Sequence, residues 1–211
     1  NAYNVAVGFQ SGLNVTTGIE NTLVGGLAGD ALTTGQYNVA IGKSALSTSL
    51  DGDHNTAIGV YALEDYEDGD GNGFNTAVGS QSQAQATTGE FNTSLGASSM
   101  GVGVTTGDGN TVLGYSAGLA ITSGAENVFI GSNAGDALTT GYFNVGIGHE
   151  ALSTEDGHGY NVAVGHHALR VQNAGADAYN TAVGYSAGIA ITTGTTTTLL
   201  GGFAGTALTT A

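Results

Sequence analysis

A five-residue pattern, Asn-(Thr/Val)-x-(Val/Ile/Leu)-Gly, recurs along the whole chain at a nearly constant spacing. Its copies begin at Asn4, Asn21, Asn38, Asn55, Asn75, Asn92, Asn110, Asn127, Asn144, Asn161, Asn180 and, with Thr in place of Asn, Thr197. Eight of the eleven spacings are 17 residues and the others are 20, 18 and 19. A fixed period of this length is the signature of stacked repeats. Residues 1–211 are therefore predicted to be a single repeat array. Because neither end shows a capping repeat, we expect it to be a segment of a longer chain.

Each repeat can be numbered from its Asn, which is position 1. Positions 1 to 4 are rich in Thr and β-branched residues and stop at an invariant Gly, which predicts a short strand ending in a turn. Residues before a frequent Thr-Thr-Gly, such as 31–34, are predicted to form a second strand. The fold class is thus all-β, a parallel β-solenoid of about 12 coils with two short strands per coil. Like positions should pair across the coil spacing of about 4.8 Å.

Stacking of like positions predicts three structural ladders. Asn at position 1 should bond to its equivalent one coil away, the aliphatic residue at position 4 should line the interior, and Gly at position 5 should make the turn. Two repeats illustrate the set: Asn38, Ile41, Gly42 and Asn127, Ile130, Gly131.

Position 3 points to the opposite side of the strand from positions 2 and 4. It is small or apolar in nearly every repeat, as in Leu23, Ala40, Val112, Phe129 and Leu199. With position 4 assigned to the interior, position 3 would form an exposed apolar stripe. Such a stripe predicts an assembly face covered by other copies of the chain.

Charge and composition exclude several function classes. Only 2 Lys and Arg stand against 17 Asp and Glu, a net charge of −15, which disfavours nucleic acid as a partner. The same balance favours solubility outside the cell. Cysteine is absent, and the chain has no apolar run long enough for membrane insertion. No nucleophile, general base and oxyanion site can be assembled from recognisable motifs, so we expect no enzyme activity.

The residues at 180–188, Asn-Thr-Ala-Val-Gly-Tyr-Ser-Ala-Gly, together with the Thr-Thr-Gly closing the coil, resemble the tandem repeats of phage tail fibres. Val-Ala-Ile-Gly at 39–42 is also similar to the head repeats of trimeric autotransporter (YadA-like) adhesins, although those repeats are shorter. The resemblance implies a left-handed coil, a homotrimer and a location on a virion tail fibre or cell surface.

Two groups of side chains are candidate metal ligands. Asp65, Glu67, Asp68 and Asp70 offer clustered carboxylates on a glycine-containing loop, which suits calcium, although an acidic solvated loop has the same composition. His149 and His166 both occupy position 6 of adjacent repeats and should stack. On a trimer axis they could bind a transition metal, and the alternative is a pair of exposed turn histidines.

Aromatic residues precede the Asn in seven repeats, and five of them form a candidate binding surface: Tyr37, Phe91, Phe143, Tyr160 and Tyr179. Such a ladder could stack against the sugar rings of a glycan receptor. It could equally pack at a corner of the coil, which the absence of a hydroxyl on Phe favours.

We therefore interpret the chain as a structural and adhesive fibre segment, the shaft or head of a phage tail fibre that reaches a host glycan or protein receptor. One alternative is a bacterial surface adhesin or extracellular filament subunit. The other is an ice-binding β-solenoid, suggested by the regular Thr pairs. No cofactor is expected other than the possible calcium.

Overall fold

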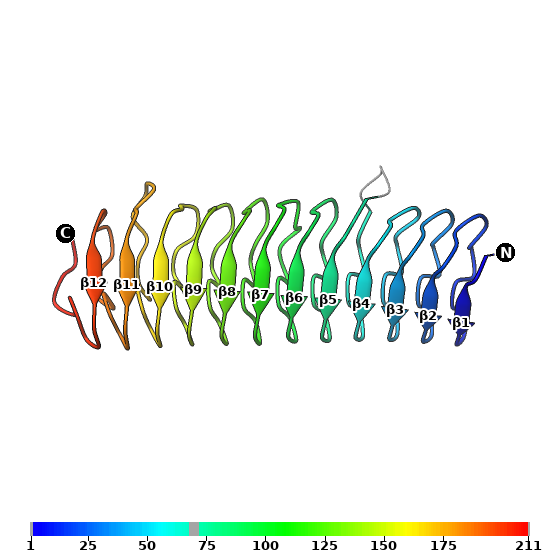
Figure 1. Cartoon of the computed structure of the whole chain (residues 1–211), viewed down its shortest axis with the longest axis horizontal. Coiled ribbons are helices and arrows are strands. Elements are labelled where there is room, and N and C mark those ends of the chain that lie inside the picture. The colour runs from blue at the N-terminus through cyan, green and yellow to red at the C-terminus, as the bar shows by residue number, and fades with distance from the viewer. Residues whose placement is uncertain (1, 68–71, 211) are drawn as a thin grey trace.

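In a computed structural model, which describes residues 2–67 and 72–210, the chain is a rod of stacked coils with one strand per coil (Figure 1). The strands are β1 (Val5–Val7), β2 (Thr22–Val24), β3 (Val39–Ile41), β4 (Thr56–Ile58), β5 (Thr76–Val78), β6 (Thr93–Leu95), β7 (Thr111–Leu113), β8 (Val128–Ile130), β9 (Val145–Ile147), β10 (Val162–Val164), β11 (Thr181–Val183) and β12 (Thr198–Leu200). All occupy positions 2 to 4 of the repeat, so the prediction of a β-solenoid with a strand at this place is confirmed.

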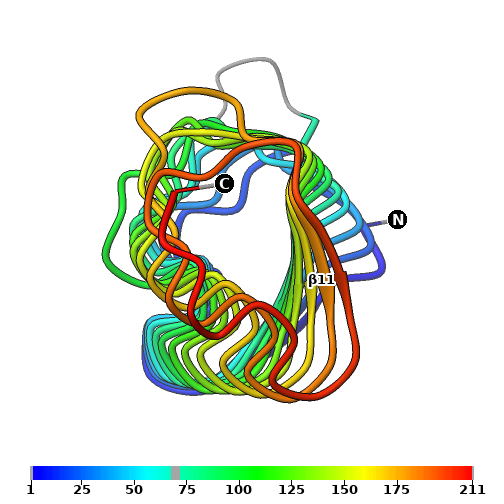
Figure 2. The ribbon, with the colours of Figure 1, turned by 90° about the vertical axis from the view of Figure 1, so that its left-hand side faces the viewer.

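The twelve strands form one parallel sheet in chain order. The register pairs like positions throughout, for example Val39 with Thr56 and Ile41 with Ile58. Figure 2 looks along the rod and shows the coils superimposed, with the sheet as one wall. The longer repeat 161–179 adds its extra residues away from the sheet, so that β10 and β11 still pair in register.

The predicted second strand is absent from the described residues. Residues 31–34 form bends, and although the Thr33 N–H still bonds to the Leu50 carbonyl of the next coil (2.7 Å), the Leu32 N–H turns back to Gly29 (3.2 Å). Left-handed backbone also recurs at positions 7 and 9, as in Ser44 (φ 53°) and Leu46 (φ 52°). These local turns keep hydrogen bonds between coils but interrupt the extended geometry that a strand requires.

The sides assigned to positions 3 and 4 were inverted in the sequence-based prediction. The expected assembly-face residues at position 3 lie inside the coil: Leu23, Ala40, Val112 and Phe129 are at most 1% exposed, and Leu199 packs against the core. Position 4 instead points outward, with Ile41 38% exposed and Ile130 half-buried. Position 3 shares the interior with other buried positions of the same coil, such as Leu32 and Leu46, and the aliphatic residue at position 4 is left on the outer face.

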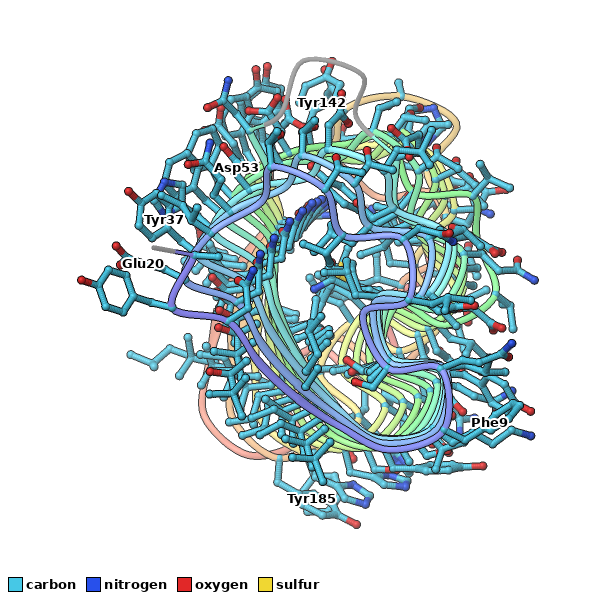
Figure 3. The ribbon with its side chains drawn as sticks, turned by 90° about the vertical axis from the view of Figure 1, so that its right-hand side faces the viewer. Phe9, Glu20, Tyr37, Asp53, Tyr142 and Tyr185 are labelled. Atoms are coloured by element: carbon cyan, nitrogen blue, oxygen red, sulfur yellow. The ribbon has the colours of Figure 1, made fainter. Side chains whose placement is uncertain are left out.

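Inside each coil, a large side chain at one inward position is accompanied by a small residue at another, so that the interior is filled without overlap. In the coil that starts at Asn21, Gly29 at position 9 leaves room for Leu23 and Leu32. A Cβ on Gly29 would lie 2.8 Å from the Leu23 Cδ2. In the next coil the pattern is reversed, because a buried Leu46 occupies position 9 and Ala40 occupies position 3. Figure 3 shows side chains filling the ring of backbone. This complementarity satisfies the close packing that protein interiors require.

Glycine at position 5 is required by both its conformation and its neighbour. Gly42 has a φ of 138°, and a Cβ there would lie 2.3 Å from the Gly59 carbonyl oxygen. Gly131 has a φ of 133°, with the Gly148 carbonyl oxygen 2.6 Å from the same hypothetical atom. The predicted turn at Gly42 and Gly131 is therefore present, and it brings successive backbones into direct contact.

Asparagine at position 1 forms the predicted ladder along the inside of the coil. Asn38 Nδ2 donates to the Gly52 carbonyl (2.6 Å), and Asn38 Oδ1 accepts from the Asn55 N–H (2.9 Å). Asn127 repeats the pattern, donating to the Gly141 carbonyl (2.9 Å). The column of backbone N–H donors to Asn side-chain oxygens continues to the Thr197 N–H, which donates to Asn180 Oδ1 (2.8 Å). Each amide thus ties its own coil closed and holds the next coil in register.

Candidate functional site

The outer face of the sheet presents positions 2 and 4 of every repeat along the rod. Position 2 contributes Val5, Thr22, Val39, Thr56, Thr76, Thr93, Thr111, Val128, Val145, Val162, Thr181 and Thr198, and position 4 contributes only Val, Ile or Leu. Leu95 is 45% exposed and Leu113 is 40% exposed, and no charge interrupts either column in these strands. The apolar stripe expected at position 3 thus exists one residue later, at position 4.

A first aromatic ladder runs along the corner just before position 1. Tyr37 stacks on His54 (4.7 Å between ring centroids), His54 on Phe74 (4.7 Å), and Phe74 on Phe91 (5.3 Å). The three aromatic members are exposed at their outer faces, and Tyr37 projects from the rod in Figure 3. The sequence-based prediction of this ladder included only Tyr and Phe and left out His54. Its place directly before Asn55 was the available signal.

The remaining predicted aromatic residues form a second, separate ladder. Phe143 stacks on Tyr160 (5.3 Å) and Tyr160 on Tyr179 (4.8 Å). Tyr142 lies edge-on to both Phe143 and Tyr160, and the Asp177 carboxylate beside it raises the pKa of the Tyr142 phenol. The five predicted residues are therefore split between two ladders. Both ladders stack ring on ring along the rod, and their Tyr and Phe members remain exposed to solvent.

The predicted calcium ligands fall only partly within the described residues. Asp68 and Asp70 lie outside them. Asp65 is exposed, and the Glu67 carboxylate accepts a hydrogen bond from the Leu50 N–H (2.7 Å). Calcium at this loop stays a prediction.

Histidines gather where β9 and β10 end. His149 and His166 stack as expected, with ring centroids 5.1 Å apart and an interplanar angle of 15°. His167, which the sequence-based pairing left out, lies 3.7 Å from His166 between centroids. The Glu150 carboxylate lies 3.1 Å from His167 Nε2 and accepts a hydrogen bond from Arg170 (3.1 Å). Two consecutive coils thus contribute residues at positions 6 and 7 to one cluster.

The electrostatics of this cluster favour neutral imidazole beside a charged carboxylate. Burial lowers the pKa of His167, and the neighbouring His166 lowers it further. Burial would by itself raise the pKa of Glu150, but the Arg170 hydrogen bond and the nearby histidines hold it below its ordinary value. These shifts favour a neutral His167 imidazole beside an ionised Glu150 carboxylate.

A second group of possible metal ligands consists of Glu155, Asp156 and His158, which follow His149 in the same coil. Glu155 is fully buried and its Oε1 accepts from the His158 N–H (3.0 Å), with His158 Nδ1 3.1 Å away. Asp156 completes the group. The local hydrogen bonds from Gly157 and His158 to Glu155 close this turn, which gives the group a structural role.

Concave sites and membrane-spanning elements are both lacking in the described residues. Over residues 2–67 and 72–210 the surface has no pocket, and no helix there is long and apolar enough to cross a membrane. Comparison of the chain with protein-family models, curated proteins and solved structures found no match.

Proposed function

We propose that the chain is a structural segment of an extracellular fibre, and that copies associate through the outer face of the sheet into a homotrimer. The observation that carries the proposal is the uncharged column of Val, Ile and Leu at position 4, flanked by Thr and Val at position 2. Contiguous apolar surface of this length on a soluble chain marks an interaction site. The repeat gives the face the same kind of residue at each level along the rod, which suits pairing with an identical neighbour.

The proposal of three copies per assembly is based on the resemblance to trimeric adhesin heads and tail fibres. In that arrangement the sheets of three rods face a common axis, and the aromatic ladders remain on the outer corners. There they are available to a glycan or protein receptor on the host or surface to which the fibre attaches. The net charge of −15 surrounds the assembled face with negative, soluble surface.

The test is the mass of the protein in solution, measured by light scattering and sedimentation velocity. The wild-type chain should be a trimer, and Leu95→Glu combined with Leu113→Glu should dissociate it, because two added charges from each of the three copies would be buried at the axis. The matched control is Val104→Glu, which adds a charge at an exposed residue outside the sheet. A stable wild-type monomer would refute association. A dimer would keep association and refute the trimer.

A second candidate, ice binding, is favoured by one feature of the same face. Threonine occupies seven of the twelve outward positions at position 2, in register on a parallel sheet. Thermal hysteresis measured on the wild-type chain separates the two functions. Hysteresis from a monomer supports ice binding, and an oligomer without hysteresis supports the fibre.

A further inference from the structure

We propose that His149, His166 and His167 form a binding site for a divalent transition-metal ion, with Glu150 as the carboxylate that orients His167. The proposal does not rest on the fibre function, since all four residues belong to one chain. One ligand atom from each of the three histidines lies within 4.8 Å of the other two. The ring of Tyr185, labelled in Figure 3, marks this corner of the rod because it stacks on His166 (5.0 Å).

The fold brings the three imidazoles together through the in-register stacking of two coils. His149 and His166 occupy position 6 of successive repeats, so the parallel register places one above the other. His167 follows at position 7, where the left-handed backbone (φ 59°) is shared with Glu150 (φ 53°) one coil away. The same stacking therefore sets Glu150 beside His167, in the way that it sets His149 beside His166.

An unpartnered nitrogen points independently to a ligand. His166 Nδ1 is buried and has no hydrogen-bond partner among the described residues. Buried polar atoms in proteins are nearly always satisfied by protein, water or an ion. A metal ion bound to the His166 imidazole would satisfy it directly or through the tautomer that binding selects.

The Glu150 carboxylate contacts His167 on one ring nitrogen and leaves the other ring nitrogen for a metal ion. A proton on His167 Nε2, 3.1 Å from the Glu150 carboxylate, leaves the lone pair of that ring on Nδ1. Carboxylates orient metal-binding histidines in this way, and their loss typically weakens metal affinity about 10- to 100-fold. The Arg170 guanidinium on the same carboxylate keeps Glu150 ionised and fixed.

The donor set selects the class of metal. Three imidazoles without thiolate suit Zn²⁺, Ni²⁺, Co²⁺ or Cu²⁺ and disfavour Ca²⁺ and Mg²⁺, which need oxygen ligands. Tetrahedral Zn²⁺ with Zn–N bonds of about 2.1 Å holds its nitrogens about 3.4 Å apart, so the ligand atoms, now within 4.8 Å of one another, must approach by up to about 1.4 Å. The side chain of His149 is 46% exposed and can rotate to do so. A fourth position remains for water, because three protein ligands leave it open.

Zinc binding to untagged protein, measured by isothermal titration calorimetry, tests the site. One Zn²⁺ per chain is expected, and His166→Ala, His167→Ala and Glu150→Gln should each weaken binding at least about 10-fold. Co²⁺ should give the visible absorption of a nitrogen-ligated ion in the wild-type protein and lose it in His166→Ala. Circular dichroism verifies that each variant retains the wild-type fold.

Two matched controls separate this site from the other histidines. His54→Phe keeps the aromatic stack of the first ladder and should bind Zn²⁺ like the wild type. His158→Ala alters the second group of candidate ligands and should also leave the affinity unchanged. Absence of Zn²⁺ binding by the wild-type protein would overturn the proposal, as would wild-type affinity in folded His166→Ala and His167→Ala, or loss of binding in His158→Ala.

Discussion

Replacement of Asn110 by alanine should destabilise the rod far more than the loss of one polar side chain on a surface would. The Asn110 side chain is fully buried; its Nδ2 donates to the Gly124 carbonyl (2.8 Å) and its Oδ1 accepts from the Asn127 N–H (3.1 Å). Two further contacts within the ladder, to the side chains of Asn92 and Asn127, have other partners that remain. Alanine therefore leaves two buried backbone groups without their ladder partner, the Gly124 carbonyl and the Asn127 N–H.

The magnitude follows from those two groups. A buried polar group left unpaired costs about 1–3 kcal/mol, so Asn110→Ala should lower the free energy of unfolding by about 2–6 kcal/mol. Asn110→Asp should be worse at neutral pH, because it places a carboxylate against the Gly124 carbonyl oxygen, and it should recover part of the loss in acid. The control is Asn14→Ala. Asn14 is exposed and its Nδ2 donates to the Asp30 carbonyl (2.7 Å), so water can bond to that carbonyl when the side chain is removed.

Urea unfolding followed by circular dichroism, with hydrogen exchange of individual amides, measures the effect. Because a linear array can unfold in parts, the exchange of the Asn127 N–H reports the local loss independently of the global midpoint. We expect faster exchange there and a lower midpoint than in Asn14→Ala. An Asn110→Ala midpoint equal to that of Asn14→Ala, with a protected Asn127 amide, would refute the role assigned to the ladder.

Three other predictions follow from the coil geometry. Gly114→Ala should cost at least about 2 kcal/mol, because φ is 141° and the new Cβ would lie 2.6 Å from the Gly131 oxygen; Gly26→Ala, with open space around its Cβ, is the control in the same thermal melts. Phe129→Ala should cost about 3–5 kcal/mol by opening a cavity in a fully buried layer, measured by urea unfolding, and a loss below 1 kcal/mol would contradict that packing. Burial raises the pKa of Asp136, so the folded state binds that proton more tightly than the unfolded chain, and wild-type stability falls as pH rises from the ordinary value through the raised one. Asp136→Asn should therefore have a higher free energy of unfolding than the wild type at pH 7, by up to about 1 kcal/mol, and should lose this advantage below about pH 3. An equal difference at both pH values would contradict the assignment.

The candidate sites were predictable to the extent that they depend on one repeat position. The stacking of His149 on His166 follows from their shared position 6, and the stacking of Tyr160 on Tyr179 follows from their shared place before Asn. The inclusion of His167 depends on the left-handed turn at position 7, which carries no residue signature because Ser, Glu, His and Tyr all occupy it. A cluster that combines two different positions could therefore be found only in the folded chain.

The sequence by itself determined the stacking of the coils. Their period, the strand at positions 2 to 4, the turn at Gly42 and the ladder through Asn38 each depend on one residue type repeated in register, and repetition makes such a local preference visible. Only the tertiary structure decided which side of that strand faces inward. Alternation offers two choices, and the inner volume is shared with positions 8, 9 and 12 of the same coil. Because Leu46 fills that volume from position 9, Ala40 is the residue that fits inside and Ile41 is the residue left at the surface.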